Sequence, residues 1–271
     1  MTPDPTQTPP SSYPPAATEA RIRANLASVR RRIDDACYRC GRDPATVRLL
    51  PVSKTVAVER LRLAYAAGCR ELGENKVQEA RHKHQTLADL TDLRWSVIGH
   101  LQTNKARYVA RFASEFQALD SIRVAEALER RLQQEGRALD AMVQVNTSGE
   151  DSKYGLAPDQ VAPFLKALTS FSCLRVRGLM TLALWSSDTD RVRACFVRLR
   201  QLRDQLRQSA PDRIDLTHLS MGMSGDFETA IEEGATVVRV GQAIFGARPL
   251  PDSHYWPDAA SSPTPQAEQT Q

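Results

Sequence analysis

The strongest constraint on the fold is a regular alternation, from residue 47 to residue 245, of short apolar segments with stretches of helical periodicity. The predicted strands span residues 47–54, 71–73, 95–99, 116–120, 141–146, 174–180, 214–219 and 236–240, and helical patterns follow them at residues 58–67, 76–87, 104–112, 122–134, 158–168, 188–207, 226–233 and 243–245. Strands that are separated by a helix pair in parallel through right-handed crossovers. Eight such units favour a closed barrel over an open sheet. We therefore predict a single α/β domain, a (β/α)8 barrel of the TIM type.

An additional helix is predicted ahead of the first strand, at residues 20–40. Its apolar residues recur at steps of three and four and share one face: Ile22, Leu26, Val29, Ile33 and Cys37. Both ends of the chain are instead rich in proline and poor in large aliphatic residues, and six of the 16 prolines lie within residues 1–18. Such segments bury too little apolar surface to offset the entropy of ordering. We expect residues 1–18 and 250–271 to be disordered tails and residues 19–249 to form the barrel.

The composition argues against several classes of protein. The five cysteines lack disulfide-framework spacing, which favours a reducing cytoplasm, and no second pair joins Cys37 and Cys40 to complete a metal site. The net charge of +4 comes from arginines that are scattered among acids, so nucleic-acid binding is not expected. No segment has the pattern of an export signal or a membrane span. We expect a cytoplasmic protein without metal or membrane contact.

A (β/α)8 barrel binds its ligand where the strands end, at the carboxyl face. Lys54 ends the first predicted strand and should point into the mouth of the barrel. Burying an ammonium group is costly unless it is paired or neutralised, and a partly desolvated lysine loses its proton and attacks carbonyl groups. Lys54 is therefore a candidate for anion binding or for covalent chemistry with a carbonyl. A lysine that simply reaches solvent from the rim is the structural alternative.

Two glycine-containing turns follow the seventh and eighth strands, at residues 220–226 and 239–242. Glycine lets the backbone approach a ligand closely, and Ser224 is a natural N-cap for the helix that follows. The free N–H groups at a helix start hold phosphate, and phosphate sites after strands seven and eight recur in this fold. Each turn alone is better explained as a simple tight turn. Together with Lys54 they indicate a ligand that is an anionic aldehyde.

Arg239 alternates with Val237 and Gly241 along the eighth strand, so the three residues share one side, which we assign to the barrel interior. A buried arginine keeps its charge and requires an acceptor. A pyridine nitrogen would serve, and a carboxylate such as Glu74 is the alternative.

Six motifs occur in order along the chain: Val52-Ser53-Lys54-Thr55, Gly73-Glu74-Asn75, Ile98-Gly99-His100-Leu101-Gln102, Arg177-Gly178-Leu179-Met180, Met221-Gly222-Met223-Ser224 and Arg239-Val240-Gly241. Over about residues 47–248 they closely resemble the pyridoxal 5′-phosphate (PLP) homeostasis family, which is related to the barrel domain of alanine racemases.

This resemblance implies a Schiff base between PLP and Lys54, and it places Arg239 near the pyridine nitrogen. It implies phosphate contacts from Ser224, Gly241 and Gln242, with Asn75 and Met223 as walls of the pocket. Family members often carry Ser or Thr at the position of Gln242, so here the phosphate contact falls to the backbone N–H.

The resemblance further implies a non-catalytic PLP-binding protein that buffers or delivers the cofactor, with PLP-dependent client enzymes as partners, and we expect a monomer. The alternatives are a PLP-dependent amino-acid racemase and a barrel that binds sugar phosphates. Racemases of this type add a second, β-rich domain, whereas this chain becomes rich in proline after Arg248. Lys153, in the loop after the fifth strand, is a candidate for assisting PLP transfer, and a solvated loop lysine is the simpler alternative.

Overall fold

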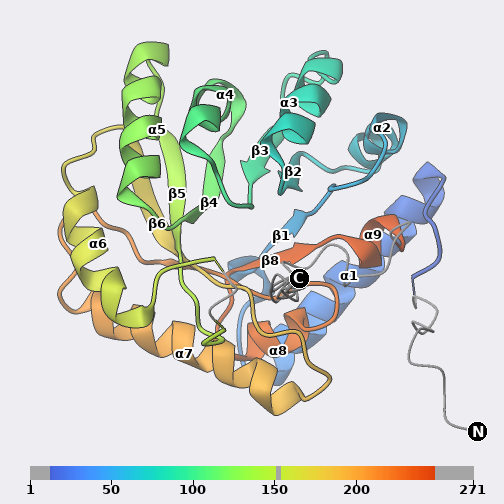
Figure 1. The fold of residues 1–271 in the computed structure, drawn as a ribbon. Coiled ribbons are helices and arrows are strands. Elements are labelled where there is room, and N and C mark those ends of the chain that lie inside the picture. Colours follow the sequence, from blue (N-terminus) through green and yellow to red (C-terminus); the bar gives the residue numbers. More distant parts are fainter. Residues whose placement is uncertain (1–12, 151–153, 248–271) are drawn as a thin grey trace, which may run out of the picture.

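The computed structural model describes residues 13–150 and 154–247, which form one eight-stranded parallel sheet (Figure 1). Its strands are β1 (Arg48–Pro51), β2 (Glu71–Glu74), β3 (Arg94–Val97), β4 (Glu115–Leu119), β5 (Leu139–Gln144), β6 (Leu174–Met180), β7 (His218–Ser220) and β8 (Val237–Val240). The sheet order is β1-β8-β7-β6-β5-β4-β3-β2, so the first strand pairs with the last. A bridge between Val52 and Gly73, with the Ser53 N–H donating to the Gly73 carbonyl at 2.9 Å, brings β1 against β2. The predicted (β/α)8 barrel is confirmed.

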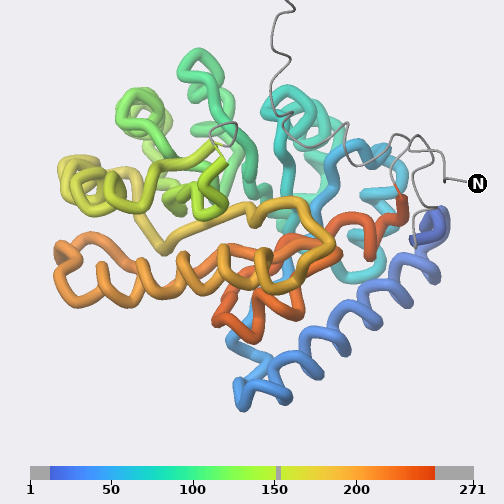
Figure 2. The backbone as a smooth tube through the Cα atoms, turned by 60° about the horizontal axis from the view of Figure 1, so that its bottom comes forward, coloured from blue at the N-terminus to red at the C-terminus, as the bar shows by residue number. Residues whose placement is uncertain are grey.

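Helices follow the strands and surround the sheet, and α1 precedes it as predicted. They are α1 (Glu19–Arg39), α2 (Val58–Ala66), α3 (Val77–Thr86), α4 (Ala106–Phe112), α5 (Ile122–Glu135), α6 (Val161–Leu168), α7 (Thr189–Arg207), α8 (Phe227–Glu232) and α9 (Gln242–Phe245). Figure 2 shows α1 running along the side of the barrel formed by α8 and α9, and it contacts both. The Thr18 hydroxyl caps α1 by accepting the Arg21 N–H at 3.2 Å.

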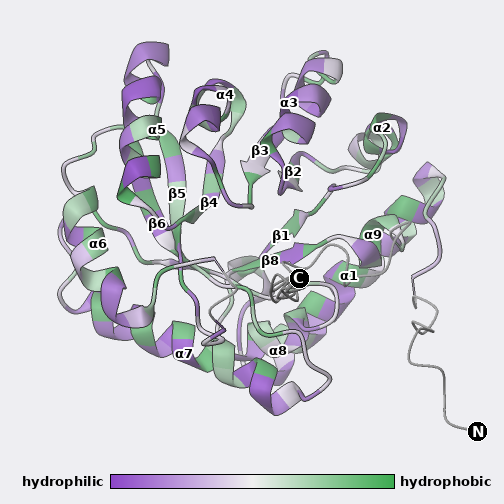
Figure 3. Cartoon of the chain, in the orientation of Figure 1, coloured by the Kyte–Doolittle hydropathy of each residue, from purple (hydrophilic) through white to green (hydrophobic). Residues whose placement is uncertain are grey.

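The hydrophobic core lies between the sheet and the shell of helices. Trp95, Phe116, Phe196 and Phe227 are among its largest fully buried side chains. Hydrophobic and hydrophilic residues alternate around each helix, as Figure 3 shows, because each helix packs one face on the sheet and exposes the other.

The first and seventh strands differ from their predicted bounds by three residues or more at one end, whereas the other strands differ by two residues or fewer. The ladder of β1 ends at Pro51, and the chain then turns, so Lys54 follows the strand and does not end it. The seventh strand begins at His218 and not at residue 214, because the Asp215 carboxylate accepts the Thr217 N–H at 2.8 Å and bends the chain there. Ile214 is nevertheless buried, so its apolar character reports core packing and not strand pairing.

Residues 13–18 pack on the barrel, although composition placed them in a disordered tail. Ala16 is fully buried, and its N–H donates to the Phe245 carbonyl at 3.3 Å. The Ala247 N–H donates to the Tyr13 carbonyl at 2.9 Å, so this segment runs beside the end of α9. Small residues and backbone groups make these contacts, which a count of large aliphatic residues cannot detect. The rest of both predicted tails lies outside the described residues.

Candidate cofactor site at the carboxyl ends of the strands

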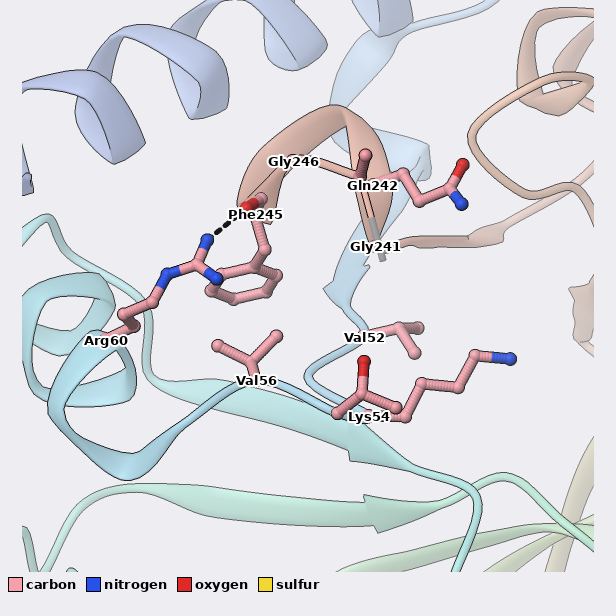
Figure 4. Close-up of a pocket in the computed structure, with 10 residues that line it drawn as sticks. Val52, Lys54, Val56, Arg60, Gly241, Gln242, Phe245 and Gly246 are labelled. Carbon is pink, nitrogen blue, oxygen red and sulfur yellow. Dashed lines mark hydrogen bonds between the residues drawn. The ribbon is translucent and has the colours of Figure 1, made fainter. Parts of the chain in front are cut away.

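A pocket opens at the seam where β1 meets β8 (Figure 4). It is lined by Val52, Lys54, Thr55, Val56, Arg60, Gly241, Gln242, Phe245, Gly246 and Ala247. Lys54 comes from the turn between β1 and α2, whereas Gly241 and Gln242 begin α9. The Lys54 and Gln242 side chains extend in the same direction from opposite walls of the pocket (Figure 4). Two predicted site segments that are distant in sequence therefore share one pocket.

Lys54 lies in a tight turn, residues 53–56, in which the Val56 N–H donates to the Ser53 carbonyl at 3.0 Å. Thr55 has a φ of 66°, and within residues 13–150 and 154–247 it is the one non-glycine residue with positive φ. This conformation is strained for a β-branched residue and persists only where the surroundings hold it. Here the Thr55 N–H donates to the Glu79 carboxylate at 2.8 Å. The turn is therefore held in a defined conformation next to the candidate lysine.

A buried ion cluster centred on Lys83 supports this turn. Its ammonium donates to the Ser53 carbonyl at 2.7 Å, to Glu74 Oε1 at 2.7 Å and to Glu79 Oε1 at 2.6 Å. The Ser53 hydroxyl also donates to Glu74 Oε1, at 2.6 Å. Burial raises the pKa of the Glu74 carboxyl, and the Lys83 charge opposes this shift. Lys83 was not assigned from the sequence, although its four-residue spacing from Glu79 on one helix was a usable signal.

Ser224 lies beside the start of α9, where it accepts the Gly241 N–H at 3.2 Å and the Ala243 N–H at 3.4 Å. The expectation that Ser224 caps the next helix is wrong, since Asp226 holds the N-cap position of α8. The donors that gather at the Ser224 hydroxyl come from α9 instead. Gly241 favours close packing of the start of α9 against Val52, because a Cβ there would lie 3.1 Å from the Val52 carbonyl oxygen. The serine and the two N–H groups form a small polar cradle at the edge of the pocket.

Arg239 points into the barrel interior and is 3% exposed. Its guanidinium donates to Ser220 Oγ at 2.6 Å and to the Thr181 carbonyl at 2.8 Å. The alternative partner Glu74 is wrong: Glu74 follows the inward-facing Gly73, so its side chain faces α3 and Lys83. Burial lowers the pKa of Arg239 to about 10, and the charges of Asp226 and Glu115 oppose this shift. Arg239 is therefore cationic at neutral pH.

The other predicted residues lie on loops at the same end of the barrel. Asn75 follows β2 and is half-buried, and its carbonyl oxygen would lie 2.2 Å from a Cβ at Gly99. Met223, also half-buried, donates its N–H to the Asp226 carboxylate at 2.5 Å. Their role as walls of the pocket stays a prediction. Lys153 lies outside the described residues.

A second group of polar side chains at this end was not assigned from the sequence. His100 follows β3 and stacks on Tyr154, which follows β5, with ring centroids 4.3 Å apart. His100 Nδ1 lies 4.0 Å from a carboxylate oxygen of Asp120, which follows β4. Burial raises the pKa of Asp120, and His100 opposes the shift. The mouth therefore has titratable groups on the β3–β5 side as well as on the seam between β1 and β8.

The described residues contain no group of three or more His, Cys, Asp or Glu side chains that could hold a metal ion. Cys37 is buried on α1, and Cys40 Sγ donates to the Ala36 carbonyl at 3.2 Å. None of the helices formed by residues 13–150 and 154–247 is both long and apolar enough to cross a membrane.

A (β/α)8 barrel with a lysine at the seam between β1 and β8 matches a known class of barrel domain. The family described as "Alanine racemase, N-terminal domain" matches residues 19–249. The alanine racemase of Streptomyces coelicolor A3(2) superposes with a TM-score of 0.66 at 18% identity, covering 86% of this chain and 59% of the racemase. At that identity the likeness shows the fold alone.

Other relatives are more similar. The pyridoxal phosphate homeostasis protein of Pseudomonas aeruginosa is 43% identical over 227 residues, which are 84% of this chain and 96% of that protein. The structure of PipY from Synechococcus elongatus PCC7942 with PLP bound superposes with a TM-score of 0.74 at 37% identity, covering 83% of this chain and 100% of PipY. This chain belongs to the pyridoxal phosphate homeostasis protein family.

The ion cluster predicts a pH-dependent loss of stability in Lys83→Met. Without Lys83, Glu74 keeps its burial but loses its counter-charge, so its pKa rises further above the unfolded value. Below the unfolded carboxyl pKa of about 4.3, Glu74 is protonated in both states and the loss is small. As the pH rises above that value, the loss should grow to about 3 kcal/mol at pH 7. Urea denaturation of the wild type and of Lys83→Met at pH 4 and pH 7 measures this loss of unfolding free energy.

Lys166→Met is the matched control, because Lys166 is an exposed helical lysine. Its free energy of unfolding should stay within about 0.5 kcal/mol of the wild type. A loss in Lys83→Met that is equal at both pH values would contradict the role assigned to Glu74.

Proposed function

We propose that this protein binds PLP at the β1–β8 seam and acts in intracellular PLP homeostasis without catalysing a reaction. The observation that supports this most directly is that Lys54 and the glycine turn before α9 line one pocket, next to the Ser224 cradle. The P. aeruginosa relative has the name of a PLP homeostasis protein, and PipY holds PLP. A cytoplasmic location, a monomeric state and PLP-dependent client enzymes stay predictions.

The residues present fit this cofactor. PLP supplies an aldehyde that reacts with a lysine amine, and Lys54 is the lysine on the pocket wall. The phosphate would be held by the Ser224 cradle, which includes the Gly241 N–H, together with the neighbouring Gln242 N–H, because N–H groups at a helix start favour anions. Arg239 would face the pyridine nitrogen as a donor, with Asn75 and Met223 at the sides of the ring.

The charge of Arg239 is one observation that supports the absence of catalysis. PLP enzymes that stabilise a carbanion work best when the ring nitrogen is protonated and faces a carboxylate. A permanent cation at that position disfavours protonation of the nitrogen. The residues that support binding are thus poorly suited to carbanion chemistry.

The attachment site is tested by reduction and peptide mapping. Borohydride treatment of the PLP-loaded protein should fix a phosphopyridoxyl group on Lys54, because this lysine lines the pocket. Lys54→Ala should lose the visible absorption band of bound PLP and keep its circular dichroism spectrum, whereas Lys76→Ala, which removes an exposed lysine, should keep both. A label found mainly on another lysine would show that the attachment lies elsewhere.

The phosphate cradle is tested by Ser224→Ala. Loss of one hydrogen bond to a charged group should weaken PLP binding by about 1–2 kcal/mol, roughly 5- to 30-fold in Kd. Pyridoxal, which lacks the phosphate, should bind much more weakly than PLP to the wild type. Ser170→Ala, which removes an exposed hydroxyl bonded to the Ala167 carbonyl, is the control and should bind normally. Equal retention of pyridoxal and PLP by the wild type would rule out the cradle as the phosphate site.

The racemase alternative has one observation in its favour, the titratable group of His100, Tyr154 and Asp120 at the mouth. We expect the PLP-loaded protein in D2O to exchange the Cα–H of alanine slowly or not at all, with no sustained D/L interconversion. Proton NMR and chiral chromatography measure these two rates. Steady racemisation that disappears in Lys54→Ala would make the protein an enzyme.

A further inference from the structure

The interior of this barrel is unusually polar. Bulky branched side chains fill most (β/α)8 barrels. Here Ser96, Gln117 and Ser220 are fully buried, and Arg239 is nearly so. Because a buried polar group without a partner is costly, such side chains must satisfy one another.

A continuous chain of hydrogen bonds leads inward from Arg239. Its Nη1 donates to Ser220 Oγ at 2.6 Å, and Ser220 Oγ donates to Gln117 Oε1 at 2.7 Å. Gln117 Nε2 in turn donates to Glu115 Oε2 at 2.7 Å. The chain has one direction, because an arginine is only a donor and a serine hydroxyl has one proton. The Gln117 amide must therefore face its oxygen to Ser220 and its nitrogen to Glu115.

Glu115 anchors the inner end of this chain. Arg48 Nη2 donates to its two oxygens at 2.7 and 2.9 Å, and the Ser96 hydroxyl donates to Oε2 at 2.9 Å. Glu71 accepts the other Arg48 nitrogen at 2.7 Å. The Glu115 carboxylate is thus held in place from several sides, and it fixes the inner end of the chain.

Arg239 itself contacts neutral acceptors: of its hydrogen bonds among the described residues, one goes to Ser220 Oγ and one to the Thr181 carbonyl. Two acids act on its charge from further away, Asp226 and Glu115. Asp226 is engaged by the Met223 N–H, whereas Glu115 is joined to Arg239 through Gln117 and Ser220. A direct carboxylate partner would occupy the guanidinium. The relay of Ser220, Gln117 and Glu115 instead orients the guanidinium and leaves further N–H donors for a ligand.

We propose that Glu115, Gln117 and Ser220 are positioning residues that orient Arg239 toward the ring nitrogen of the cofactor. The inference rests on the proposed function, because it needs a pyridine ring at the mouth. It also predicts a specificity. The relay should strengthen the contact between Arg239 and an acceptor nitrogen in the ring, and it should leave the contacts with the rest of the ligand unchanged.

The test compares PLP with its 1-deaza analogue, in which a C–H group replaces the ring nitrogen. Kd values for both are measured on the full-length protein by absorbance titration. The wild type should prefer PLP by about tenfold or more, the scale of a hydrogen bond to a charged donor. Gln117→Met, which keeps the side-chain length and removes the amide, should lose most of this preference by weakening PLP alone. Arg239→Met should lose it fully, and adding Gln117→Met to Arg239→Met should change nothing further.

Ser220→Ala is the second variant, a smaller change that should reduce the preference in the same way if Gln117→Met fails to fold. Gln144→Met is the matched control: this buried glutamine of β5 donates to the Tyr154 carbonyl and is not in the relay, so the preference should persist. A preference that is unchanged in both Gln117→Met and Ser220→Ala, or equal weakening of the two ligands, overturns the proposal. A wild type that binds neither ligand instead overturns the proposed function.

Discussion

Closure of the parallel barrel is the constraint on which the site depends. The Val52 N–H donates to the Val240 carbonyl at 2.9 Å and joins the first strand to the last. Because the strands are parallel, their carboxyl ends meet at one face, and this closing bond places Lys54 beside the turn at Gly241. A glycine suits this position, since a Cβ at residue 241 would lie 3.1 Å from the Val52 carbonyl oxygen. The pocket is thus formed by the seam itself and does not exist in either segment alone.

Two buried cations at this end of the molecule are stabilised in different ways. Lys83 lies outside the barrel wall and contacts two carboxylates directly, so its charge is neutralised and its role is to support the Lys54 turn. Arg239 lies inside the wall and reaches Glu115 only through two neutral side chains. Direct pairing suits a structural charge, whereas a relay keeps a charge available to a ligand. This contrast explains why the interior of the barrel is polar where a hydrophobic core would be simpler to build.

The fold could be predicted from the sequence because every β/α unit has its own hydrophobic period, and eight such units close in only a few ways. The strand ends also placed Lys54, Arg239 and Gly241 on one face. What could not be predicted depends on side-chain direction in short strands, where a shift of one residue reverses the face. Glu74 and Gly73 are neighbours, yet the former faces Lys83 and the latter faces the interior. The hydrogen bond between Ser220 and Gln117 joins two strands that are not adjacent in the sheet. No local sequence pattern predicts such a contact.

The N-terminal segment adds contacts that the family match does not include. The match begins at residue 19, whereas the Tyr13 hydroxyl donates to the Ser224 carbonyl at 3.0 Å. Arg60 donates to the Ala16 carbonyl at 2.9 Å and also to the Phe245 carbonyl, so one side chain ties this segment to α9. Both ends of the proposed phosphate cradle, the Ser224 loop and α9, are thereby held by residues 13–16. A cradle made of backbone N–H groups binds well only when its two halves keep their spacing. Residues 13–16 therefore add a second restraint on the cradle to the one that the barrel seam provides.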